Sequence, residues 1–355
     1  MMQRFAIFLS IILITAASFY FFQDKRKLSL PLKTTTLEEY KEKYPKNVMY
    51  IDFNTSDPKE FIVILNNGYV FEDGRVITEG SEILEDVAVL KYGGAIKDNP
   101  LLKKKGFPEP KKVGSTLAVI ASNGEENYYH WVFHVLPRIK LLQESKIPFD
   151  KIYIYNIKYR YQKESIRLLG IDEDKIYIGK ENQFIQAEKL LVPSIAVKPA
   201  IGKLFPKWVI SFLNEKFLIN DKNKQFPEKV FVSRSKAFSR RIINEDELFK
   251  ILEPKGYKKV FLEDLHVREQ AVIFHHAKEI VAAHGSGLSN LVFCKPGTKI
   301  VEINPFDGHR GPYKMLAGQM ELSYEDVDTT TNGLTPHQVE EDDIFVDIEK
   351  VKEVL

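Results

Sequence analysis

Two histidines and an arginine are spaced four residues apart in an aromatic segment of this 355-residue chain. His130, His134 and Arg138 lie within 127–138, so a helix there would place all three on one face. Histidines with this spacing can bind zinc, but no glutamate follows His130 and no further ligand is apparent, which excludes a metalloprotease site. No metal site is predicted. Two interpretations stay open: core histidines with hydrogen-bonded rings, or a general base at His130 or His134.

A glycine turn lies at 284–287, directly after an apolar run that predicts a strand over 279–283. Gly285 and Gly287 allow the backbone to approach a ligand, and the free N–H groups of a following helix attract anions. With His284 and Ser286 beside them, a pyrophosphate is the favoured ligand. The third glycine of the dinucleotide fingerprint is missing, so NAD is not favoured. The alternative is an ordinary strand-to-helix turn that uses glycine to bend.

Three arginines form a second candidate anion site. Ser233 and Arg234 end a predicted strand, and Arg240 and Arg241 precede a predicted helix. Cations beside the positive end of a helix are unfavourable unless an anion lies between them. Guanidinium groups bind phosphate oxygens through paired hydrogen bonds. The alternative is a solvated basic loop, but together with the glycine turn these arginines predict a diphosphate site.

Strands and helices alternate along two stretches of the chain, which predicts an α/β fold with parallel sheets. In such sheets ligands bind at the carboxyl ends of the strands. Glu302 ends a predicted strand and is expected to hold ribose hydroxyls. The predicted division is a membrane anchor over 1–27, a polar stem over 28–48, an N-terminal α/β domain over 49–200, a connector with one amphipathic helix over 201–228, a C-terminal Rossmann-like domain over 229–335, and a tail with a final helix over 336–355.

Local patterns predict finer detail. An apolar run over 61–65 followed by Asn66, Asn67 and Gly68 predicts a strand entering a hairpin turn. Asn244, with Glu247 three residues later, is a predicted helix cap. The apolar segment 288–293 predicts the start of a helix after the glycine turn.

The amino end predicts a membrane segment. Residues 5–22 carry no formal charge, which suits a transmembrane helix retained as a single-pass anchor. A cleaved signal peptide is the alternative, because small residues follow the apolar stretch at 15–17. Basic residues at 25–27 favour a chain on the cytoplasmic side, whereas a domain in the lumen of the endoplasmic reticulum or Golgi would need the reverse orientation.

Composition excludes several classes. The 51 Lys and Arg residues nearly balance 49 Asp and Glu residues, which leaves a net charge of +2. That balance does not favour nucleic-acid binding, which needs clustered positive charge. The single cysteine, Cys294, excludes an intrachain disulfide and a cysteine-rich zinc site.

Taken in order, these motifs resemble the family-61 glycosyltransferases over about residues 122–305. The residues that carry the resemblance are Asn127-Tyr128-Tyr129-His130-Trp131 through Leu136-Pro137-Arg138, Val232-Ser233-Arg234, Arg240-Arg241-Ile242, Asn244-Glu245, Glu269-Gln270, His284-Gly285-Ser286-Gly287-Leu288-Ser289-Asn290, Pro296-Gly297 and Val301-Glu302-Ile303. The family includes enzymes of plant xylan decoration, of O-GlcNAc transfer to secreted proteins and of bacterial capsule synthesis.

The resemblance implies two Rossmann-like domains that face each other across a cleft, the GT-B arrangement. It further implies a UDP-sugar as donor substrate, no cofactor, no tightly bound metal, inversion at the anomeric carbon, and a glycan or glycoprotein as acceptor. Two positions depart from the family pattern. His134 stands where relatives often have Asp or Glu, and Ser286 stands where Ala is usual.

An inverting transfer needs a base for the acceptor hydroxyl and positive charge for the leaving diphosphate. His130 or His134 is the expected base, and Arg234 and Arg241 with the helix start near Gly287 are expected to meet the charge. Two other functions are weighed. One is a membrane-anchored nucleotide-binding scaffold without turnover. The other is a phosphate-ester hydrolase, for which only Ser286 and Ser289 offer nearby hydroxyl groups and no base accompanies them.

Overall fold

The computed structural model describes residues 28–54, 59–72, 74–87, 99–181, 184–197, 205–218, 225–305, 311–329 and 343–355. The membrane segment predicted at 5–22 lies outside these residues. Among the helices of the described residues, none combines the length and the apolar character needed to cross a membrane.

The first sheet is mixed, and its strands follow the order β1-β6-β5-β4-β10-β7-β8-β9, with β2 and β3 joined to it through β10. Its strands are β1 (Lys33–Thr35), β2 (Val48–Ile51), β3 (Glu60–Asn66), β4 (Tyr69–Phe71), β5 (Arg75–Ile77), β6 (Glu82–Leu84), β7 (Lys111–Val119), β8 (Lys151–Ile154), β9 (Ile176–Ile178) and β10 (Phe184–Pro193). The part β10-β7-β8-β9 is parallel, and at the far edge β1 also pairs with β6 in parallel. The expected parallel layer is therefore confirmed there, while β2 to β6 add antiparallel pairs.

Two predictions for this sheet are wrong. Asn66, Asn67 and Gly68 do not make a hairpin, because β3 and β4 both pair with β10 and the chain only bulges between them. Asn67 takes the left-handed conformation, with φ of 51°, at that bulge. The residues 28–48 are not a polar stem: they form β1 and helix α2 (Leu37–Lys43), whose Leu37 and Tyr40 are buried in the core.

The second sheet is fully parallel, in the order β12-β11-β13-β14-β15. Its strands are β11 (Lys229–Val232), β12 (Lys258–Val260), β13 (Glu279–Ala283), β14 (Lys299–Asn304) and β15 (Ser323–Asp328). The chain starts in β11, goes outward to β12, and returns to the other side of β11 at β13. This order is that of the doubly wound fold, and its switch point lies between β11 and β13.

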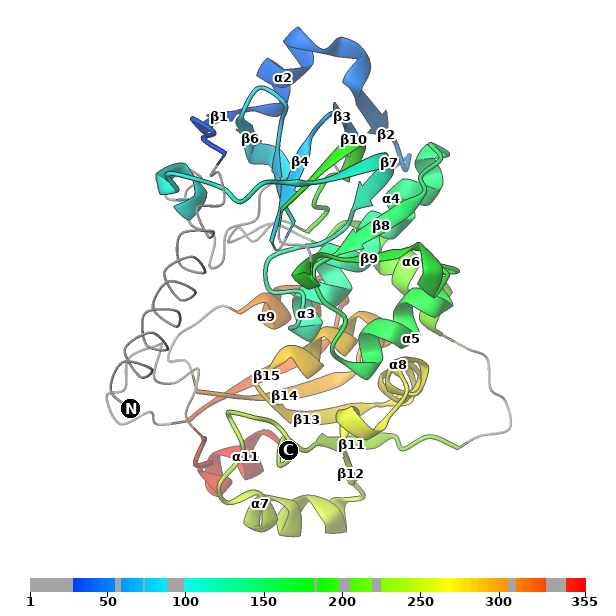
Figure 1. Ribbon diagram of the computed structural model, residues 1–355. Coiled ribbons are helices and arrows are strands. Elements are labelled where there is room, and N and C mark those ends of the chain that lie inside the picture. Colours follow the sequence, from blue (N-terminus) through cyan, green and yellow to red (C-terminus); the bar gives the residue numbers. More distant parts are fainter. Residues whose placement is uncertain are drawn as a thin grey trace, which may run out of the picture.

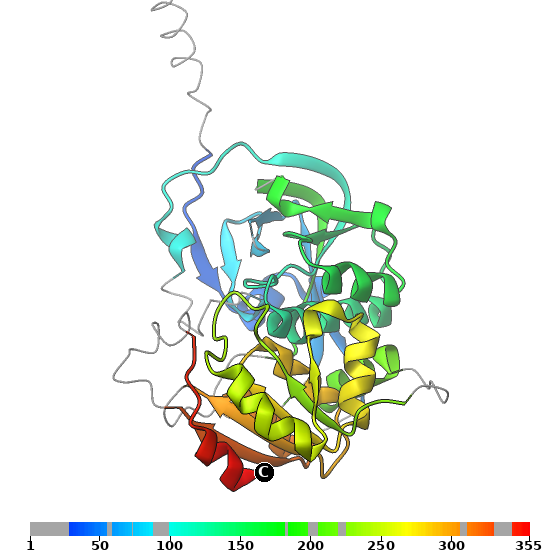
Figure 2. The same ribbon diagram turned by 90° about the horizontal axis from the view of Figure 1, so that it is seen from below.

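Helices cover both sheets. They are α3 (Tyr128–His130), α4 (Leu136–Ser145), α5 (Arg160–Leu168), α6 (Lys207–Phe217), α7 (Glu245–Leu252), α8 (Val267–His276), α9 (Pro312–Gln319) and α11 (Ile348–Val354). Figure 1 shows α3 and α9 between the two sheets, and α5 beside α8. Seen from below in Figure 2, α7 and the red α11 cover the outer face of the second sheet.

One helix prediction needs correction, and the helix expected after the glycine turn is confirmed as a 3-10 helix. Asn244 precedes α7, but its side chain makes no cap bond to that helix; it donates to the carbonyl of Val346 and accepts from its N–H. The segment after the glycine turn is the 3-10 helix η11 (Ser286–Phe293), where the apolar pattern predicted a helix of unspecified type.

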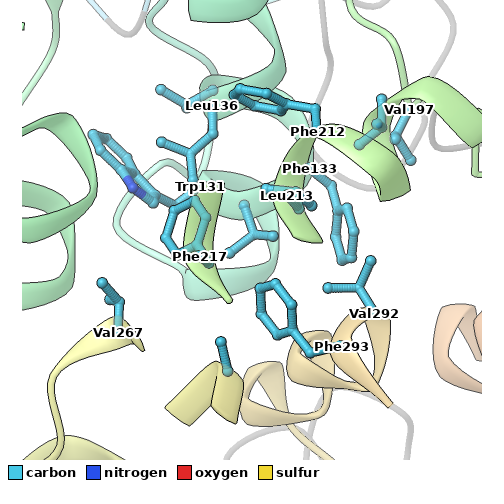
Figure 3. Close-up of a cluster of buried hydrophobic side chains, with 14 of the residues drawn as sticks. Trp131, Phe133, Leu136, Val197, Phe212, Leu213, Phe217, Val267, Val292 and Phe293 are labelled. Carbon is cyan, nitrogen blue, oxygen red and sulfur yellow. The ribbon is translucent and has the colours of Figure 1, made fainter. Parts of the chain in front are cut away.

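One hydrophobic core joins the two sheets. Trp131, Phe133 and Leu136 come from the first half of the chain, and Val292 and Phe293 come from η11 in the second. Helix α6, predicted in the connector, adds the buried side chains of Trp208, Phe212, Leu213 and Phe217 to the same cluster. Figure 3 shows Phe212, Leu213 and Phe217 of α6 together with apolar side chains from both halves. The core therefore fixes how the two sheets lie relative to each other.

Candidate active site

A cavity of about 1070 Å³ lies between the two sheets. Residues that follow strands of the second sheet line one side of it, and α3 with the starts of its neighbours lines the other. Of the predicted site residues, His130, Ser233, Arg234, Arg240, His284, Gly285, Ser286 and Gly287 line the cavity. His134, Arg241 and Glu302 are not among the lining residues. Most of the site residues predicted from the sequence therefore line one cavity.

The topology of the second sheet brings the arginine and the glycine turn together. β11 and β13 are neighbours at the switch point, so Ser233 and Arg234 after β11 lie beside His284 and Gly285 after β13. A Cβ atom on Gly285 would overlap the guanidinium of Arg234. Glycine is needed there because the guanidinium lies directly against the backbone of the turn.

Arg234 is held in place by its own loop. Its Nε donates to the carbonyl of Arg240 at 3.0 Å and its Nη2 to the carbonyl of Ser239 at 2.8 Å. Burial, followed by the nearby positive charge of Arg240, lowers the pKa of Arg234 to about 10. Arg240 has a left-handed backbone, with φ of 56°, which few residues other than glycine adopt. Two cations held close together at a cavity wall gain stability when an anion binds between them.

The turn at Gly285 supplies the second part of an anion site. η11 starts at Ser286, and Ser286 and Gly287 line the cavity with the amino end of this helix. Asn290 fixes the first turn, since its Nδ2 donates to the carbonyl of Gly287 at 3.1 Å. Backbone N–H groups at a helix start are donors for phosphate oxygens.

Glu302 does not have the predicted role. It is 1% exposed, and its Oε1 accepts a hydrogen bond from His284 Nδ1 at 2.5 Å while Oε2 accepts from the hydroxyl of Tyr324. Both carboxylate oxygens are therefore engaged, so ribose hydroxyls are not its partners. Glu302 instead orients His284, which presents the rest of its ring to the cavity.

Arg241 is the second correction. Its guanidinium makes two hydrogen bonds to the carboxylate of Asp343, at 3.0 Å and 2.6 Å, and it is half exposed outside the cavity lining. Ser233 does line the cavity, but its hydroxyl donates to Glu245 at 2.7 Å, so the hydroxyl serves the fold. Of the three predicted arginines, Arg234 and Arg240 line the cavity, and Arg160 at the start of α5 lines it as well.

The two histidines of the aromatic segment lie one behind the other, with their rings tilted by 60°. The expected single helix is broken by a π-helical turn, η6 (Trp131–Val135), because Pro137 has no N–H to bond back to Phe133. Such turns are frequent at functional sites. His130 lines the cavity, and its Nδ1 lies 3.1 Å from Nδ1 of His134.

His134 is fully buried behind His130. Burial, with the neighbouring His130 and Arg138, lowers the pKa of His134 to about 3, so this ring is neutral at physiological pH. Arg138, on the next turn, donates to the carbonyls of Ala121 and Pro193 and serves the fold. Of the two predicted bases, only His130 can contact a ligand in the cavity.

No metal cluster is found in the part of the chain that the structure describes, where three or more His, Cys, Asp or Glu side chains would have to gather. Metal-free chemistry was expected from the sequence and stays a prediction.

Residues 128–301 match the family described as Glycosyltransferase 61. These residues belong to glycosyltransferase family 61. A beta-1,2-xylosyltransferase from Oryza sativa subsp. japonica is 28% identical over 124 residues, which is 34% of this chain. The match spans 26% of that relative, or about a quarter of its length. The chain therefore carries a glycosyltransferase domain, as the order of its motifs predicted.

The family-61 region includes the histidine pair, the arginine loop and the glycine turn, but further cavity residues were missed. Tyr313 lies outside the matched region and comes from the start of α9. Its ring lies 5.3 Å from that of His284 and 6.0 Å from that of Tyr129. Phe238, in the arginine loop, and Tyr159 also line the cavity with exposed rings. A lone aromatic residue in a loop or at a helix start gives no sequence signal that separates it from a core residue.

Proposed function

We propose that the chain transfers a sugar from a nucleoside diphosphate sugar, a UDP-sugar by family resemblance, to a hydroxyl of a glycan or glycoprotein. The observation that carries this proposal is the position of Arg234. It is a half-buried arginine packed on Gly285 at the switch point of a parallel sheet, inside a cavity that both halves of the chain line. In the GT-B arrangement that we propose, the second sheet binds the donor and the first sheet binds the acceptor.

The leaving group of such a transfer is a diphosphate whose negative charge grows as the bond to the sugar breaks. Arg234, Arg240 and the backbone N–H groups at the start of η11 converge on the part of the cavity where it would lie. Fixed charges and dipoles of this kind stabilise a transition state without rearranging as the reaction proceeds. His284, whose Nδ1 is held by Glu302, also lines the cavity at this point. The proposal assigns the neutralising charge to these groups rather than to a metal ion.

The base of the reaction is His130. Its Nδ1 is next to His134, so exchange of a proton with a substrate in the cavity goes through Nε2. In the reacting form the Nδ1–H of His130 donates to Nδ1 of neutral His134, and Nε2 accepts the proton of the acceptor hydroxyl. The hydroxyl oxygen then attacks the anomeric carbon opposite the leaving diphosphate, and the configuration inverts.

The test is transfer by the full-length chain from a panel of UDP-sugars, followed as release of UDP with and without glycan acceptors. His130→Ala should lower kcat by about a hundredfold or more, because a general base contributes roughly that much, and should leave the affinity for UDP little changed. His275→Ala is the matched control, since His275 bonds to the carbonyl of Phe293 outside the cavity.

Activity should persist in EDTA if the arginines neutralise the leaving group. Loss of activity in EDTA that a divalent metal restores would contradict the metal-free part of the proposal. Binding of UDP without release from any donor would instead support the scaffold without turnover. The membrane anchor predicted at 5–22 would place the transfer at a membrane surface.

A further inference from the structure

The cavity has two ends, and the histidines mark only one of them. At that end His130 faces the region of Tyr129, Tyr313 and His284, whose rings contact each other. Arg234 and the glycine turn, proposed above to bind the diphosphate, follow β11 and β13, and β11 lies between β12 and β13 in the sheet. The opposite end is lined by residues that follow β12, namely Leu262, Glu263 and Leu265.

From these positions we infer that the β12 end of the cavity is a nucleoside subsite, and that the carboxylate of Glu263 binds the ribose hydroxyls of the donor. This inference rests on the proposed function and names the part of the donor that each region of the cavity would bind. Glu263 takes the ribose-binding role that the sequence assigned to Glu302. The two carboxylate oxygens of Glu302 accept hydrogen bonds from His284 and Tyr324 instead.

The turn that bears Glu263 lies directly beside the diphosphate region. A Cβ on Gly287 would stand 2.8 Å from Cδ1 of Leu262, so the glycine turn and the β12 end touch. Glu263 is also close enough to Arg234 for its charge to oppose the lowering of that arginine's pKa. A ribose linked to the diphosphate therefore reaches this end of the cavity first.

The carboxylate of Glu263 is available to a ligand. It is exposed, and no residue in the described part of the chain donates a hydrogen bond to it. Two neighbouring ribose hydroxyls can donate to the two oxygens of one carboxylate, and hydrogen bonds to a charged acceptor are the stronger kind. The flanking Leu262 and Leu265 offer apolar surface to the rest of a nucleoside.

Side-chain hydrogen bonds hold the turn in place before any ligand binds. Gln270 Nε2 donates to the carbonyl of Leu262 at 2.9 Å, and Gln270 Oε1 accepts from Asn290 Nδ2 at 3.1 Å. Asn290 in turn accepts from the hydroxyl of Tyr128, at 2.9 Å. Because Asn290 lies in η11, this network fixes the Glu263 turn relative to the glycine turn, and a preorganised site loses less entropy on binding.

The test is calorimetric titration of the full-length chain with UDP and with 2′,3′-dideoxy-UDP. The native chain should bind UDP at least about tenfold more tightly, which is the effect of hydrogen bonds to a charged group. Glu263→Ala and Glu263→Gln should weaken UDP binding and leave dideoxy-UDP binding within a few-fold of native, so the preference for ribose shrinks. Asp264→Asn is the matched control: Asp264 is the adjacent carboxylate, bonded to Lys236 at 2.5 Å and outside the cavity lining.

An unchanged preference for ribose in both Glu263 variants would overturn the inference while leaving the proposed function intact. Failure of the native chain to bind UDP, GDP or CDP would contradict the proposed donor class itself, and the inference with it.

Discussion

At the scale of single residues, the most unusual feature is the neutral His134 behind His130. The ring is fully buried, and its Nδ1 faces the Nδ1 of His130 at 3.1 Å. A carboxylate at this position would stabilise a charged His130 more strongly than a neutral ring does. His134 nevertheless provides an acceptor that fixes the orientation of His130. We therefore regard His134 as a positioning residue rather than the base.

His134 should also make the fold sensitive to acid. The pKa of His134 falls from 6.5 to about 3 on folding, so between these values the unfolded chain binds a proton that the folded chain does not. The free energy of unfolding therefore decreases as the pH falls below 6.5, by up to about 1.4 kcal/mol per pH unit for one proton. Urea unfolding at pH 7.5 and 5.0 should show a smaller loss of stability in His134→Gln than in the native chain. An equal loss in both would contradict the assignment.

The sequence correctly predicted cavity-lining residues where these residues directly follow strands of the second sheet. Arg234, His284 and Gly285 follow neighbouring strands of a parallel sheet, and topology alone brings such residues together. The sequence prediction failed where a side chain is bound by a partner from a distant segment. Glu302 is taken by Tyr324, 22 residues away, and Arg241 by Asp343, 102 residues away. Neither pairing has a local signal, because an ion pair or hydrogen bond between distant segments depends on the final fold.

At the scale of elements, the close packing of the glycine turn on the arginine loop is the feature most open to test. Gly285→Ala adds a Cβ that would overlap the guanidinium of Arg234, although the extended backbone itself, with φ of 168°, accepts alanine. The guanidinium must move, so we expect UDP affinity to fall by about tenfold or more, the effect of losing a charged hydrogen bond. Melting temperature should change little.

Gly318→Ala in α9 is the control, because its Cβ would meet no atom within 4 Å. Native UDP affinity in Gly285→Ala would show that Arg234 does not contact the diphosphate.

The repeated strands and helices were predictable because their apolar periodicity is local. β13 coincides with the strand predicted over 279–283, and β11 ends at Val232, next to the Ser233 and Arg234 at which its predicted strand ends. The errors lie where several backbone conformations suit the same residues. Asn66 to Gly68 fits a hairpin or a bulge equally well, and β10 decides between them. The polar composition of 28–48 hid an amphipathic helix whose few apolar residues find partners only in the folded sheet.

At the scale of the whole molecule, the two sheets should unfold together. The cluster that includes Phe133, Phe212 and Phe293 is continuous between them, so separating the sheets would expose apolar surface on both. Calorimetry should show one transition. Phe293→Ala should lower the free energy of unfolding by about 3–5 kcal/mol, as expected for deleting a buried phenylalanine, and should keep the single transition.

Phe345→Ala, which removes an exposed ring, is the control and should have little effect. Two separate transitions, of which Phe293→Ala shifts only one, would show that the sheets are independent units.

The cavity between the sheets is the reason to treat the chain as one catalytic body. The proposed function depends most on binding of a nucleoside diphosphate by Arg234 in this cavity. Titration of the full-length chain with UDP tests this binding most directly. Arg234→Gln should weaken UDP binding by at least about tenfold, whereas Arg241→Gln, in which the arginine lost is paired with Asp343 outside the cavity, should stay within a few-fold of native. Native affinity in Arg234→Gln, or an equal loss in both variants, would contradict the account.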